Sequence, residues 1–192
     1  MTRSVITAKK WYRSMLAGNA SAVPAYDLIS TTILGSSQAS VSFDVTGLGS
    51  TYKHLQIRMV GRTARTDLGI QSVRLTFNSD GGSNYYSHEL SGNGSSISSG
   101  GGADVFMVPG YLSTNASSTN ANGVFIADIL DVFSTSKNKT MRSLSGMTSN
   151  NNISFHSGVW LNTAALTTLS MVTSTGATFN AGSRFSIYGI KG

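Results

Sequence analysis

Cysteine is absent from the sequence, and proline and charged residues are scarce. Without cysteine there are no disulfides, thiolate nucleophiles or cysteine-bound metals, so stability must come from a hydrophobic core or from assembly. Charged residues make up 11% of the chain, whereas an ordinary globular domain has about a quarter. No run of about 18 apolar residues is present, so no membrane partner is expected. At 40% apolar content, the 192 residues can still bury a sizeable core.

Basic residues are gathered at one end of the chain. Arg3, Lys9, Lys10 and Arg13 give residues 1–25 a formal charge of +4, because this segment contains no acid. The other ten basic and eight acidic residues add only +2 to reach the total of +6. This placement favours an electrostatic contact made by a tail over a basic groove on a folded domain, so nucleic acid is not an expected partner.

From residue 39 onward, apolar and polar residues alternate with a period of two, which is the pattern of half-buried strands. Turns rich in Gly, Asn, Asp and Ser separate the alternating segments, and one such stretch, 91–102, is expected to be a surface loop. With about eleven candidate strands, residues 26–192 are predicted to form an all-β domain. The expected architecture is an antiparallel two-sheet β-sandwich of the jelly-roll kind. The segments with the clearest alternation are 41–45, 55–59, 73–77, 124–129, 153–161, 166–171 and 185–187.

Residues 1–25 have a different pattern and are predicted to be an extended or helical arm followed by a linker. Between Thr2 and Leu16 there is no glycine or proline, and apolar residues recur at three-to-four spacing, so a short helix would have one apolar face. A frayed terminus is the alternative, but aromatic residues accompanied by arginine are typical of contact surfaces. The predicted anchoring residues are Arg3, Lys9, Lys10, Trp11, Tyr12, Arg13, Met15 and Leu16.

Residues that carry catalysis or bind metals are sparse. His54, His88 and His156 lie in separate segments without metal or triad spacing, and each is expected to face solvent. Asp128 and Asp131 are three residues apart, which on a strand places them on opposite faces and favours a turn or strand-end role. The sequence therefore predicts no enzyme activity, no metal site and no cofactor.

Four stretches together resemble a family of tailed-bacteriophage proteins. They are WYRSMLAGNAS in the prefix, TYKHLQIR at 51–58, FNSDGGSNY at 77–85 and SIYGIKG at 186–192. The family shows a strand pair leading into a TYKHLQIR-like segment, an F-N-x-D-x-G-S-N-Y turn and an SLYGIKG-like end. The resemblance spans nearly the whole chain and implies a minor structural protein of the virion: a non-enzymatic β-sandwich repeated around the particle exterior.

The resemblance and the predicted arm lead to a capsid decoration or cement protein, attached by residues 1–25 to a capsid shell or tail hub. The expected partners are other virion proteins and further copies of the chain, with a homotrimer as the expected assembly, because a lone sandwich exposes edge strands. The alternative is a tail fibre or receptor-binding module that contacts host glycans. Tyr85, Tyr86, Tyr111 and Trp160 are candidates for such surface contacts, and packing in the core is the competing interpretation of these aromatics.

Overall fold

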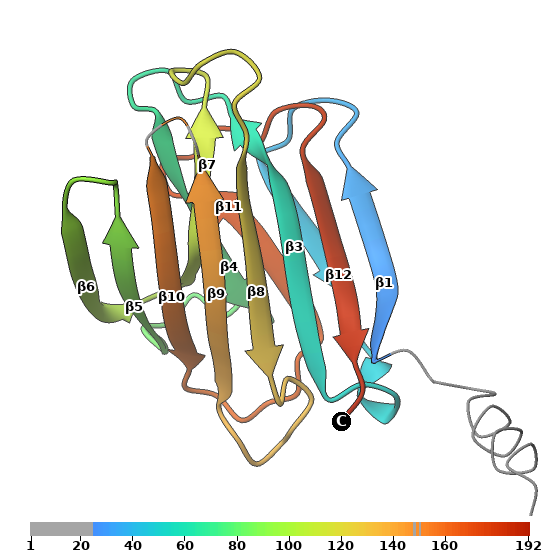
Figure 1. The fold of residues 1–192 in the computed structure, drawn as a ribbon. Helices are drawn as coiled ribbons and strands as arrows, with labels where there is room; N and C mark the ends of the chain where they lie inside the picture. The colour runs from blue at the N-terminus through green and yellow to red at the C-terminus, as the bar shows by residue number, and fades with distance from the viewer. Residues whose placement is uncertain (1–24, 148, 150) are drawn as a thin grey trace, which may run out of the picture.

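The computed structural model describes residues 25–147, 149 and 151–192, which form an almost entirely β-stranded body (Figure 1). Apart from a 3-10 turn at Leu48–Ser50, the described residues contain no helix. The all-β prediction is therefore confirmed, whereas the predicted arm lies outside the described residues except for Ala25. The strands are β1 (Tyr26–Ile33), β2 (Ser40–Asp44), β3 (His54–Thr63), β4 (Ile70–Phe77), β5 (Tyr85–Gly92), β6 (Ile97–Asp104), β7 (Met107–Thr114), β8 (Gly123–Leu130), β9 (Lys139–Met147), β10 (Asn152–Trp160), β11 (Thr168–Thr173) and β12 (Arg184–Ile190).

The strands are hydrogen-bonded in two rows. One row has the order β1-β12-β3-β8-β9-β10-β5-β6, and its neighbouring strands are all antiparallel. The other row is β2-β11-β4-β7, which is also antiparallel throughout. In Figure 1 the shorter row lies behind the longer one, and the β5–β6 hairpin projects beyond it. The inner face of this hairpin is consequently less covered than the inner face of the strands at the centre.

A short parallel contact between β3 and β7 joins the two rows, with Arg62 beside Ser113 and Thr63 beside Thr114. The Arg62 guanidinium fixes this junction, because it donates to the backbone oxygens of Thr114 at 2.6 Å and of Ser118 at 3.0 Å. The hydrogen bonding thus makes one open, mixed sheet of 12 strands. It does not show the two separate antiparallel sheets that the sequence predicted, because local alternation cannot report a parallel step between distant strands.

Buried aromatic side chains connect the two rows. Phe77 of β4 meets Trp160 of β10 edge to face, with ring centroids 5.6 Å apart. Trp160 in turn stacks on Tyr85 of β5 at 6.2 Å and an interplanar angle of 17°. Burying such a ring contributes roughly 1.5–3 kcal/mol by transfer from water, so this cluster is a main support of the hairpin end of the core.

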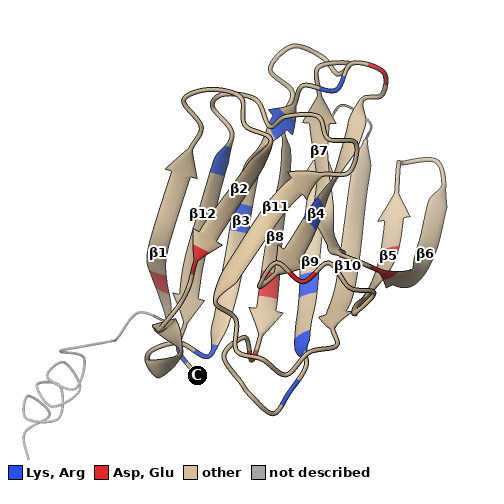
Figure 2. Cartoon of the chain, turned by 180° about the vertical axis from the view of Figure 1, so that it is seen from behind, with Lys and Arg blue, Asp and Glu red and all other residues tan. Residues whose placement is uncertain are grey.

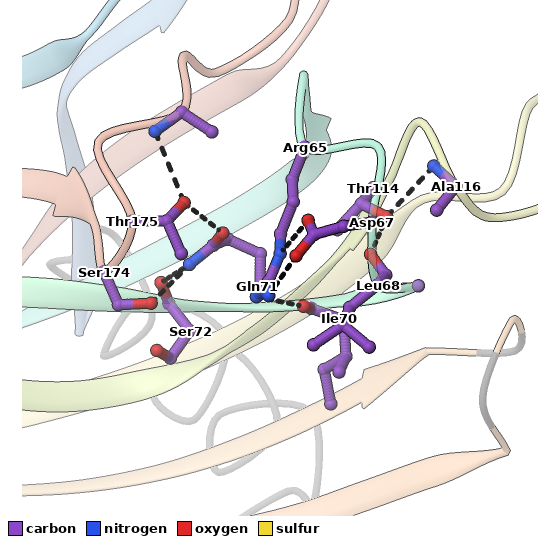
Figure 3. Close-up of polar contacts among 12 residues, drawn as sticks. Arg65, Asp67, Leu68, Ile70, Gln71, Ser72, Thr114, Ala116, Ser174 and Thr175 are labelled. Carbon is purple, nitrogen blue, oxygen red and sulfur yellow. Dashed lines mark hydrogen bonds and ion pairs between the residues drawn. The ribbon is translucent and has the colours of Figure 1, made fainter.

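A polar cluster near the β3–β7 junction is satisfied within the chain (Figure 3). The buried Gln71 side chain donates to the Ser72 backbone oxygen at 3.2 Å and to the Ser174 hydroxyl, and it accepts from the Thr175 hydroxyl at 2.8 Å. Beside it, the Arg65 guanidinium holds Asp67 at 2.7 and 3.0 Å. Because these groups find their partners inside the molecule, we interpret the cluster as structural.

Two of the stretches that carry the bacteriophage resemblance pack against each other. A Cβ at Gly189, in the SIYGIKG stretch, would lie 2.5 Å from the ring of Tyr52, in the TYKHLQIR stretch, so only glycine fits there. The Tyr52 hydroxyl donates to Asp27 at 3.1 Å, and the Lys191 ammonium lies 2.7 Å from the same carboxylate. These stretches therefore fasten the β1 end of the longer row, which is a role in folding.

Candidate functional site

Two of the four aromatic residues predicted as surface contacts lie in the core. Tyr85 is 0% exposed and Trp160 is 1% exposed, so the prediction that they could contact a glycan is wrong. Both occupy inward-facing positions, and their polar atoms bind the loop between β4 and β5. The Trp160 indole N–H donates to the Asp80 carboxylate at 2.7 Å. The Tyr85 hydroxyl donates to the Asp80 backbone oxygen at 3.2 Å. Tyr86 is exposed, whereas Tyr111 is half-buried.

The predicted anchoring residues lie outside the described residues, because all of them precede Ala25. They are Arg3, Lys9, Lys10, Trp11, Tyr12, Arg13, Met15 and Leu16.

Strand β10 buries the face that its sequence predicted to be exposed. Ile153 and Phe155, whose apolar character predicted burial, are 52% and 56% exposed on the outer face of the longer row. Ser154 and His156 instead face the inside and are buried, so the expectation that His156 faces solvent is also wrong. Strand periodicity separates the two faces of a strand but does not say which of them meets the core.

The outer face of the longer row carries a continuous apolar patch. Ile126, Leu144, Phe155 and Leu90 lie side by side across four adjacent strands, as the register of these strands shows. Its eight members are each 43–82% exposed, and a contiguous exposed apolar patch of large side chains marks an interaction site. We call it the outer patch, and it comprises Val60, Leu90, Ile97, Val124, Ile126, Leu144, Ile153 and Phe155.

Polar side chains linked to one another border the outer patch. Arg58 donates to the Gln56 side-chain oxygen at 2.7 Å, and the Gln56 amide donates to Asp128 at 2.7 Å. The Arg142 guanidinium lies 3.4 Å from the same carboxylate. An apolar centre with a polar rim is the usual composition of a protein–protein interface.

A polar pocket lies on the opposite, inner face of the β5–β6 hairpin. Glu89 of β5 is the cross-strand neighbour of His156 on β10, and its carboxylate accepts a hydrogen bond from the Tyr111 hydroxyl of β7. The Tyr111 and His156 rings are 5.4 Å apart, and Ser154 Oγ lies 2.9 Å from His156 Nε2. Burial lowers the pKa of His156, against the opposing effect of the Glu89 charge. Burial and the bond to Glu89 raise the pKa of Tyr111.

The pocket has a volume of about 380 Å³ and is open to solvent. Glu89, Asp104 and His156 contribute to its wall together with the glycines of β6. The sequence pattern does not predict this site, because residues 91–102 have the composition of a loop, whereas 97–104 form strand β6. Glu89 and His156 are 67 positions apart, and only the pairing of β5 with β10 brings them together.

The other titratable groups are dispersed. His54 Nδ1 accepts from the Asp131 backbone N–H at 2.8 Å, and Lys137 holds the Asp131 carboxylate at 2.9 Å, which is the strand-end role predicted for Asp131. Figure 2 shows the lysine, arginine, aspartate and glutamate residues scattered over the strands and loops, without a continuous basic stripe in the part drawn in colour. Within the described residues, no group of three or more His, Cys, Asp or Glu is placed to hold a metal ion. Nor does any helix there have the length and hydrophobicity to cross a membrane.

Comparisons with known proteins identify no family for the chain. No family model matches it, and no curated protein matches it either. Among solved structures, it is similar to a functionally unknown protein from Saccharomyces cerevisiae, with 8% sequence identity over 80% of this chain and 74% of that one. The TM-score of this pair is 0.24, which is too low to support any inference about fold or function.

Proposed function

We propose that this chain is a non-enzymatic structural protein on the exterior of a tailed-bacteriophage particle, most simply a capsid decoration or cement protein. In this proposal, residues 26–192 form a jelly-roll-like β domain that assembles with further copies, and residues 1–25 attach the assembly to other virion proteins. The resemblance of the stretches at 51–58, 77–85 and 186–192 supports the bacteriophage assignment. The outer patch is the observation that carries the structural role.

The occupant proposed for the outer patch is a second copy of the same chain. A stable interface needs a broad apolar face, and the outer patch extends across six adjacent strands, from Val60 on β3 to Ile97 on β6. Its rim pairs Arg142 with Asp128 inside one chain, and Arg58, the cross-strand neighbour of Ile126, donates to the neutral Gln56 side chain. A dimer would use the whole face, because a two-fold contact joins the same surface on both copies, whereas the expected trimer would divide it between two neighbours.

Sedimentation equilibrium of the purified chain tests this assignment. Wild type is expected to exceed the monomer mass of 20.1 kDa, and Phe155→Ser and Leu144→Ser are expected to shift the protein to monomer without unfolding it. Leu28→Ser is the matched control, because Leu28 is 58% exposed on β1, outside the patch. A monomeric wild type at high protein concentration, or an equal effect of Leu28→Ser, would refute the proposal.

The attachment role of the prefix is tested separately. A chain that lacks residues 1–20 should keep its circular dichroism spectrum and its oligomeric mass but no longer copurify with particles. Retention of the truncated chain on particles at full occupancy would contradict the anchoring role.

A receptor-binding module that contacts glycans remains the second candidate. It cannot rely on Tyr85 and Trp160, because both are buried. The observation that favours it is the polar pocket at Glu89 and His156, which offers hydrogen-bonding groups to a ligand at the open end of the sheet.

A further inference from the structure

We propose that the pocket under the β5–β6 hairpin binds a neutral saccharide, with Gly100 and Gly102 as its floor and Glu89 as its main hydrogen-bond acceptor. This inference is independent of assembly through the outer patch, since the two sites lie on opposite faces of the longer row. It gives the glycan-contacting candidate function a site that does not depend on the buried aromatics.

Two glycines of the pocket floor have no structural reason within the described fold. Gly100 and Gly102 lie within strand β6, where glycine costs roughly 0.5–1 kcal/mol relative to a residue with a side chain. Neither has a positive φ, and a Cβ at either position would meet no atom of the described residues within 4 Å, so nothing in that part of the chain requires glycine there. Gly101 between them is different, because a Cβ there would lie 2.5 Å from the His88 ring. Glycine inside a strand often marks a bulge, a bend or a place where a ligand or another backbone approaches, and β6 pairs with β5 without a bulge.

These two glycines lie on the pocket side of strand β6. Gly100 is the cross-strand neighbour of Glu89 and Gly102 that of Ser87, so both face the pocket rather than the outer patch. Added side chains would fill the space above the strand next to the Glu89 carboxylate. The glycines thereby leave a flat strip of backbone on which a sugar ring can lie.

The pocket also has unused hydrogen-bonding capacity. The Ser87 hydroxyl is buried and finds no partner among the described residues, although buried hydroxyls are nearly always paired. One Glu89 oxygen accepts from Tyr111, and within the residues that the structure describes no side chain donates to the other. This contrasts with the Gln71 cluster of Figure 3, where the side-chain amide is bonded within the chain through both its nitrogen and its oxygen.

The charge of the pocket selects the class of ligand. Glu89 and Asp104 are both acids, and they would repel a phosphate or an acidic sugar. Carboxylates accept strong hydrogen bonds from hydroxyl groups, and the volume of about 380 Å³ lies at the lower end of the range for small-ligand sites. A neutral saccharide of one or a few rings satisfies these conditions.

The test uses the full chain and ligand-observed saturation-transfer NMR. The probes are methyl glycosides of glucose, galactose, mannose and N-acetylglucosamine, with sialyllactose as the acidic probe. We expect at least one neutral glycoside to bind, and we expect Gly102→Val and Glu89→Gln to weaken that binding about tenfold or more. Gly35→Val is the matched control, because Gly35 also has open space at its Cβ and no positive φ but lies outside the pocket.

Thermal unfolding of every variant shows whether a loss of binding comes from a loss of folding. Gly102→Val should unfold at or above the wild-type temperature, because valine suits a strand better than glycine. Binding of none of the neutral glycosides, binding unaffected by Gly102→Val, or a preference for sialyllactose would each overturn the proposal. Measuring the oligomeric mass on the same samples shows whether a change in saccharide binding is separate from a change in assembly through the outer patch.

Discussion

The bond between Trp160 and Asp80 should make a measurable contribution to stability, and a double-mutant cycle isolates it. Trp160→Phe removes the indole N–H that donates to Asp80 at 2.7 Å and leaves space in a cluster packed against Phe77. A hydrogen bond to a charged group contributes about 1.5–3 kcal/mol. The lower end applies here, because Asp80 is half-exposed and also accepts from the Gly82 backbone N–H at 2.8 Å. With about 1 kcal/mol more for the lost volume, we expect a total loss of about 2.5 kcal/mol.

Urea unfolding followed by circular dichroism measures the cycle, at one fixed protein concentration because assembly also changes apparent stability. The variants are Trp160→Phe, Asp80→Ala and the double substitution, and the expected coupling energy is about 1–2 kcal/mol. The bond to Trp160 is the largest cause of the lowered pKa of Asp80, so its stabilisation should be present above about pH 4 and be lost as the pH falls through the folded-state pKa. Trp160→Phe should flatten that acid dependence. A coupling energy near zero, or a cost below about 0.5 kcal/mol as for a surface residue, would refute the reasoning.

Three further predictions follow from other buried groups. The Lys139 ammonium is enclosed by backbone carbonyl oxygens, three of them at 2.6–3.0 Å, so Lys139→Met should cost about 2–4 kcal/mol in urea unfolding by leaving these acceptors unpaired. Burial raises the pKa of Tyr85 to about 12, so part of the stability should be lost as the pH rises from about 10 through that value. The free energy of unfolding should therefore differ less between pH 9 and pH 11 for Tyr85→Phe than for wild type. Gly123→Ala should lower the melting temperature strongly because its Cβ would lie 2.6 Å from the Leu112 Cα, whereas Gly81→Ala, with open space at its Cβ, should leave it unchanged.

The sequence predicted the strands better than their partners. Alternation identified β2, β3 and β4 with the correct inward residues, such as Phe43, Ile57 and Leu75, because a single apolar face leaves no ambiguity. It failed for β6, where a run of serine and glycine has turn composition but becomes a strand by pairing along the whole of β5. Strand formation there is imposed by a neighbour, which local propensity cannot report.

The sequence did not predict the pocket or the outer patch, and the reasons are related. Glu89 and His156 become neighbours only through the pairing of β5 with β10, and no spacing rule connects two segments of such different position. The histidine was also assigned to the wrong face, since Phe155 beside it appeared to be the core residue. A strand with apolar residues on one side and Ser154 and His156 on the other is expected to bury the apolar side.

The inverted strand is for this reason the most informative feature of the molecule. The strand turns Ile153 and Phe155 outward and Ser154 and His156 inward. In an isolated chain this arrangement costs free energy, because apolar surface stays in water while polar groups lose their hydration. Local rules of this kind are usually broken where a protein has a second requirement to meet. Here the same inversion produces both proposed surfaces, the apolar patch outside and the polar pocket inside. Exchanging the two faces by the joint substitution of Phe155→Ser and His156→Leu should therefore abolish oligomerisation and saccharide binding together, while thermal unfolding shows a fold that is kept or stabilised. If either property survived this exchange, the corresponding surface would have been assigned wrongly.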